Sequence, residues 1–117
     1  MKKNAILFSA SNYKKSSLIR ADDLPGVKYD IHAMYKRLTQ IGFEVKQIEN
    51  VSKDQIIPAL EDNASNSPCD AIHIVYFTGH GGHANGNNYI YPIDFASRFD
   101  TSKDIETSAM NIRDIIS

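Results

Sequence analysis

The stretch that most constrains the fold is residues 71–82, which read Ala-Ile-His-Ile-Val-Tyr-Phe-Thr-Gly-His-Gly-Gly. A short and nearly continuous apolar run is typical of a strand buried on both faces, as in the centre of a parallel sheet. The run ends at three glycines around His80, and glycine tolerates positive φ and the close approach of other groups. Ligands of open α/β sheets bind beyond the carboxyl ends of the strands, so we expect His80 in the functional site.

Helical patterns separate three strand-like runs. The strand-like runs cover residues 4–10, 43–48 and 71–78, and the helical patterns cover 27–41 and 52–60. The order β-α-β-α-β is typical of parallel strands joined by helical crossovers. The sequence therefore predicts an α/β fold of three layers, with a mostly parallel sheet flanked by helices.

Three local signals mark the helix ends. Gly42 stands where a C-terminal cap belongs. Ser52 and Gln55 have the spacing of a capping box that opens the second helix. Pro58 argues against that helix unless it stays within the first turns, and residues 63–68 read as a polar break.

The last third of the chain is irregular. Residues 85–88 (Asn-Gly-Asn-Asn) predict a tight turn, 89–91 a short strand, and Ser108 the cap of a last helix. No strand pattern follows that helix, so the sheet is expected to be incomplete on its C-terminal side. Residues 1–117 are then the N-terminal part of one domain, and a further segment should cover the apolar edge of the strand 71–78.

Composition excludes several classes of partner. A net charge of −1 gives no reason to expect nucleic acid, and no apolar run reaches the ~20 residues of a membrane span. Cys69 is the single cysteine, which leaves no internal disulfide and makes the cytoplasm the default location. His80 and His83 have no further metal ligand at suitable spacing, so we expect no metal and no cofactor. His73 is expected as a buried structural histidine and His32 as an exposed one.

Several short motifs occur together in a recognisable order. They are Ala5-Ile6-Leu7-Phe8, Asn12-Tyr13, Leu24-Pro25-Gly26, Asp30, Gly42-Phe43-Glu44-Val45, Tyr76-Phe77-Thr78-Gly79-His80-Gly81 and Tyr91-Pro92-Ile93-Asp94. In this order they resemble the caspase and metacaspase superfamily of cysteine peptidases over nearly the whole chain. The resemblance implies a caspase-like fold and the cleavage of protein or peptide substrates.

The resemblance also implies roles for single residues. His80 would be the catalytic histidine, a residue type that exchanges protons near neutral pH, and the Gly81 N–H would line the oxyanion hole. Asp30 and Thr78 would line the S1 pocket and favour a basic P1 residue. Leu24 falls where caspases that cleave after aspartate have an arginine, although a shifted register would bring Arg20 there. Calcium binding by the adjacent acids Asp22 and Asp23 is a weaker alternative.

The nucleophile is the point where this chain departs from the family. The family cysteine follows the histidine by about 50 residues, which falls beyond residue 117. Cys69 precedes the strand that carries His80 at its far end, so the two should lie roughly 25–35 Å apart. We therefore expect these residues to be inactive alone and to need the remainder of the domain. The alternatives are an inactive caspase-like binding or regulatory module, and a phosphate- or nucleotide-binding α/β domain built on the glycines around His80.

Overall fold

The computed structural model describes most of the chain. The described residues are 2–11, 26–65, 70–95 and 102–116. The predictions for Arg20, Asp22, Asp23, Leu24 and Cys69 lie outside them.

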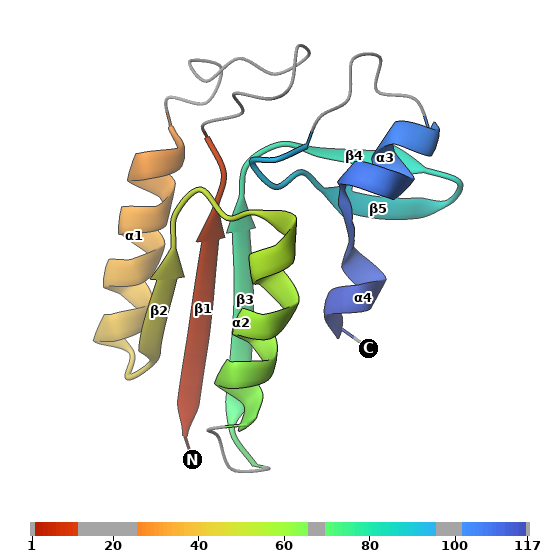
Figure 1. The fold of residues 1–117 in the computed structure, drawn as a ribbon. Helices are drawn as coiled ribbons and strands as arrows, with labels where there is room; N and C mark the ends of the chain where they lie inside the picture. Colours follow the sequence, from red (N-terminus) through yellow and green to blue (C-terminus); the bar gives the residue numbers. More distant parts are fainter. Residues whose placement is uncertain (1, 12–25, 66–69, 96–101, 117) are drawn as a thin grey trace.

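A three-stranded parallel sheet forms the centre of the molecule (Figure 1). Its strands are β1 (Lys3–Ser9), β2 (Glu44–Ile48) and β3 (Ile72–Thr78), in the order β2-β1-β3. Helix α1 (Val27–Gln40) connects β1 to β2, and helix α2 (Lys53–Ser65) connects β2 to β3. Each predicted strand and helix of this half is therefore present.

The central strand β1 is buried on both faces. Ala5 and Leu7 pack in an apolar cluster with α1, whereas Ile6 and Phe8 pack in a second cluster with Ile56 of α2. Successive side chains of a strand point to opposite faces, so the two helices cover opposite sides of the sheet. This confirms the predicted three layers.

Strand β3 is an edge strand in the described part of the chain, which corrects the prediction of a central strand buried on both faces. Among the described strands it pairs with β1 alone, and the residues Ile72 and Val75 are each 42% exposed. His73 is also exposed, contrary to the prediction of a buried histidine. The reason is that burial of an apolar strand needs neighbours on both sides, and among the described strands of this sheet only β1 has them. His32 on α1 is exposed, as predicted.

The end of α1 shows why Gly42 is required. Gly42 has a φ of +97°, and its N–H donates to the carbonyl of Thr39 (3.2 Å). The N–H of Phe43 donates to the carbonyl of Leu38 (3.0 Å), and both side chains belong to one apolar cluster. These are the two bonds and the apolar contact of a Schellman motif, so the predicted C-terminal cap is confirmed.

Helix α2 begins as predicted and continues further than predicted. The side-chain oxygen of Gln55 accepts the N–H of Ser52 (2.9 Å), which is half of a capping box. The helix includes Pro58 and ends only at Ser65, since loss of one backbone bond does not outweigh the packing of its apolar face.

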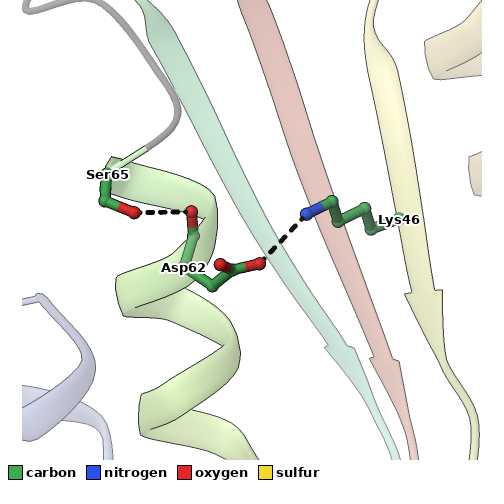
Figure 2. A network of polar contacts seen from close by, with 3 residues as sticks. All are labelled: Lys46, Asp62 and Ser65. Atoms are coloured by element: carbon green, nitrogen blue, oxygen red, sulfur yellow. Dashed lines mark hydrogen bonds and ion pairs between the residues drawn. The ribbon is translucent and has the colours of Figure 1, made fainter.

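Figure 2 shows the last turn of α2, where the Ser65 hydroxyl donates to the Asp62 carbonyl and the Asp62 carboxylate lies 3.5 Å from the Nζ atom of Lys46 in β2. This ion pair is exposed and contributes little to stability.

A small antiparallel sheet follows β3 directly. Its strands are β4 (Gly81–Ala84), β5 (Asn87–Ile90) and β6 (Met110–Asn111), in the order β4-β5-β6. Asn85 (φ +50°) and Gly86 (φ +80°) form the turn between β4 and β5. Two residues with positive φ define a type I′ hairpin turn, so the predicted turn is two residues shorter than 85–88.

The C-terminal helices differ from the prediction. Helix α3 (Ser102–Ser108) ends at Ser108, and helix α4 (Ile112–Ile116) begins only after β6. The side-chain oxygen of Asn111 accepts the N–H of Arg113 (2.9 Å), so Asn111 and not Ser108 caps the last helix. None of the helices in the described residues combines the length and apolarity needed to cross a membrane.

Candidate active site

His80 follows the carboxyl end of β3, where the connections of the parallel sheet diverge. The chain leaves β1 toward β2 on one side, whereas β3 lies on the other side of β1. Such a switch in strand order leaves a crevice outside the carboxyl ends of the two strands, and ligands of α/β sheets bind there. The N-terminus of α1 reaches the same edge (Figure 1). His80 therefore lies beyond the strand end, as the sequence predicts.

The backbone of His80 is tied to the hairpin that follows it. Its carbonyl accepts the N–H of Tyr91 (2.9 Å), the residue directly after β5. The residue is half-buried, and the Nε2 atom of its ring has almost no contact with solvent. The backbone of His80 is therefore held by the strand before it and by the exit of the hairpin.

The N–H of Gly81 points away from the hairpin ladder. Gly81 pairs with Ile90, and the bond between His80 and Tyr91 flanks that pair on one side. In an antiparallel ladder, flanking bonds of this kind mark a pair whose own N–H and C=O groups point outward. Strand β4 is an edge of its sheet in the described residues, and Gly81 is exposed. A ligand beside His80 can therefore reach this donor.

The glycines after His80 belong to an extended strand, which corrects the prediction of a loop. Neither Gly81 nor Gly82 has a positive φ. Their role is to permit close approach: a Cβ on Gly82 would lie 1.9 Å from the Tyr91 hydroxyl oxygen, and one on Gly81 would lie 3.0 Å from the Tyr89 carbonyl oxygen. The ring of Tyr91 is fixed there because it stacks on Phe95, with centroids 4.0 Å apart.

The two predicted S1 residues share one side of the sheet. Thr78 pairs with Ser9 and lies on the face of β3 that Ile74 and Tyr76 present to α1. Asp30 lies in the first turn of α1 and is exposed. Both residues are therefore on the α1 side at the carboxyl edge. Neither of two cavities beside α1, of about 220 and 330 Å³, has them in its lining.

The smaller of these cavities is a feature that sequence reasoning missed. Its polar lining includes Lys28, Glu49 and Asn50. Asn50 has a φ of +51°, and its side-chain oxygen accepts the N–H (3.1 Å) and the hydroxyl (3.3 Å) of Ser11. Glu49 and Asn50 directly follow β2. Ligands of open α/β sheets bind beyond the carboxyl ends of the strands, and this argument, which led to His80, applies equally to these two residues.

The chemistry open to this edge is proton transfer and hydrogen bonding to a ligand. Within the described ranges, His80 and His83 are not part of a group of three or more potential metal ligands. The glycine segment continues as strand β4, so it does not supply the helix N-terminus on which phosphate cradles depend. A histidine and an outward-pointing N–H beside it are the groups that acyl-transfer enzymes use.

Comparison with known proteins gave one finding. The family model described as "Caspase domain" matches residues 2–115, which is nearly the whole chain. The search of curated proteins found no match to this chain.

Proposed function

The chain belongs to the caspase domain family of cysteine peptidases, and on that basis we propose that it carries the histidine part of a caspase-like cysteine endopeptidase. The observation that supports this most directly is the place of His80 and the Gly81 N–H at the carboxyl end of β3. A peptide bond held there would have a base on one side and a hydrogen-bond donor on the other.

The proposed reaction is acyl transfer through a thioester. His80 takes the proton of a cysteine thiol, and the thiolate attacks the peptide carbonyl carbon. The negative charge on the carbonyl oxygen is stabilised by the Gly81 N–H. His80 then gives the proton to the departing amine, and afterwards activates a water molecule that hydrolyses the thioester.

The proposed source of the thiol is a segment outside residues 1–117 that pairs with the outer edge of β3. Exposed Ile72 and Val75 on this edge favour an apolar neighbour. An apolar cavity of about 160 Å³, lined on one side by Val75 and Phe77, lies next to it. A parallel strand at this edge would end beside His80, and a cysteine at its end would be within reach of the imidazole.

The proposed substrate is a protein or peptide with a basic residue before the scissile bond. This proposal is supported by the exposed carboxylate of Asp30 and by its place on the same side of the sheet as Thr78. A guanidinium that binds a carboxylate through two parallel hydrogen bonds gives strong selectivity for arginine.

The experiment is a hydrolysis assay on the native protein that contains this chain, with fluorogenic peptides ending in Arg, Lys or Asp. The variant is His80→Ala, and the matched control is His83→Ala, which removes an exposed histidine three residues further on. We expect His80→Ala to lower kcat by about 10³-fold or more, and His83→Ala to have little effect. Equal activity of wild type and His80→Ala would contradict the proposal. A wild-type protein that cleaves none of the peptides would instead support the inactive binding module.

A further inference from the structure

Backbone hydrogen bonds form a closed ring around the carboxyl edge of the parallel sheet. On the hairpin side, Tyr91 donates to the carbonyl of His80 (2.9 Å), and Ile93 donates to the carbonyl of Val51 (2.9 Å). The segment 91–95 thus connects His80, two residues after the end of β3, with Val51, two residues before the start of α2.

The other half of this ring runs through β1. Val51 donates to the carbonyl of Ser9 (3.0 Å), and Ala10 donates to the carbonyl of Thr78 (3.0 Å). Val51 and Ala10 are completely buried, so these bonds are shielded from competing water. We call these four bonds the backbone ring. Any shift of the segment 91–95 moves the bond that holds His80.

The side chain of Asp94 anchors the segment 91–95 to helix α2. The Asp94 carboxylate accepts the N–H of Lys53 (2.9 Å), the first residue of α2, in a partly buried position. Helix N-termini have unsatisfied N–H groups and favour a negative charge, so this contact is both a cap and a charge interaction.

The segment itself is compact, so the anchor acts on all of it. Phe95 donates to the carbonyl of Pro92 (3.0 Å), which closes a turn around Asp94. The stacked rings of Tyr91 and Phe95 join its two ends. A displacement at Asp94 is therefore transmitted to Tyr91 instead of being absorbed between them.

We propose that Asp94 is a positioning residue for His80: its carboxylate fixes the segment 91–95 to α2, and the Tyr91 N–H thereby fixes the backbone of His80. The effect on catalysis rests on the proposed function, whereas the effect on the backbone does not. Displacement of a catalytic group by about 1 Å can cost roughly 100-fold in rate, so a residue that never touches substrate can matter for kcat.

The first test compares two caps of the same helix. Asp94→Ala removes the cap that belongs to the segment 91–95, and Gln55→Ala removes the side-chain cap on Ser52, which lies outside that segment. Amide hydrogen exchange of Tyr91 is measured by NMR in the native protein that contains this chain. We expect exchange about tenfold faster in Asp94→Ala and little changed in Gln55→Ala. Equal exchange rates in the two variants would overturn the proposal.

A second pair of variants keeps the test valid if Asp94→Ala does not fold. Lys53→Pro removes the donor N–H at the first helical position, where proline is well tolerated. Lys53→Ala keeps that N–H and removes the side chain beyond Cβ, including the ammonium that donates to the carbonyl of Thr107 (3.0 Å). We expect faster exchange of Tyr91 in Lys53→Pro than in Lys53→Ala. The reverse order, or no difference, would overturn the proposal.

The catalytic consequence is measured on the native protein with the peptide assay described above. We expect Asp94→Ala to lower kcat about tenfold or more with little change in KM, and Asp94→Asn, which keeps an acceptor oxygen, to restore most of it. If wild type hydrolyses no peptide, the proposed function fails, and the exchange measurements still decide whether Asp94 holds the backbone ring. If wild type is active and kcat is unchanged in Asp94→Ala, the positioning role fails alone.

Discussion

At the scale of single residues, the His80 segment is governed by space more than by backbone freedom. Gly82 lies under the ring of Tyr91, and that ring is held by Phe95. A glycine-rich stretch can arise from positive φ or from close packing, and the sequence alone does not distinguish the two causes. Here the packing explains Gly82, and positive φ explains Gly42 and Gly86.

The first prediction at this scale concerns Gly82→Ala. The new Cβ would overlap the Tyr91 hydroxyl, so the ring must move and lose its stack on Phe95. We expect the free energy of unfolding to fall by about 1–3 kcal/mol in urea denaturation. Gly26→Ala is the control, since its φ of −83° suits alanine and its nearest neighbour is 4.0 Å away. A Gly82→Ala protein as stable as wild type would show that the Tyr91 ring is not fixed.

The second prediction at this scale separates two carboxylates near α1. In the native protein, Asp30→Asn should lower kcat/KM for substrates with arginine at P1 by roughly 10–100-fold, because a charged hydrogen bond is lost. The control is Glu49→Gln, which changes a carboxylate in the cavities beside α1. If Glu49→Gln abolishes the preference and Asp30→Asn does not, the S1 pocket is the cavity beside Glu49.

At the scale of elements, the sequence predicted a helix cap correctly where one local signal stood alone and wrongly where two signals competed. Gly42 and Gln55 use local signals, and both act in the structure as predicted. The C-terminal third has competing signals, because Ser108 and Asn111 are both good cap residues. The choice between them depends on the pairing of Met110 with Ile90 of β5, which is a contact distant in sequence.

The prediction at this scale compares those two cap residues. Asn111→Ala should lower the free energy of unfolding by about 1 kcal/mol, because the N–H of Arg113 loses its acceptor. Ser108→Ala should change it by less than about 0.5 kcal/mol, since Ser108 ends α3 and does not begin α4. Urea denaturation measures both. A larger loss for Ser108→Ala would mean that the last helix starts where the sequence pattern suggests.

At the scale of the whole molecule, the period of the apolar residues was enough to predict the layers. Two runs of period about 3.6 between three apolar strands leave few arrangements other than a parallel sheet covered on both faces. The strand order was not predictable in this way, because an apolar run shows that a strand will be buried but not by which neighbours. Strand β3 has the composition of a central strand and the position of an edge in the described residues. The pairing of His80 with the segment 91–95 was also not predictable, since it joins residues through a hairpin whose first strand contains two glycines.

The prediction at this scale tests whether the edge of β3 is covered in the native protein. Val75→Asp would place a charge under the proposed neighbouring segment and should lower the free energy of unfolding by more than about 2 kcal/mol. Lys46→Ala is the control, because Lys46 lies on the same sheet face in the opposite edge strand and is exposed. A native protein in which Val75→Asp costs no more than Lys46→Ala would show that the edge of β3 faces solvent.

The two edges of the parallel sheet differ in chemical character, and this gives the domain a direction of growth. Strand β2 carries Glu44 and Lys46, each in an ion pair, and charged side chains discourage the addition of another strand. The apolar edge of β3 has no such protection and lies on the side of His80. On the proposed function, a strand that completes the sheet therefore delivers the nucleophile by the same event. Addition of that strand would then activate proteolysis, and the domain would have no peptidase activity before the strand pairs with β3.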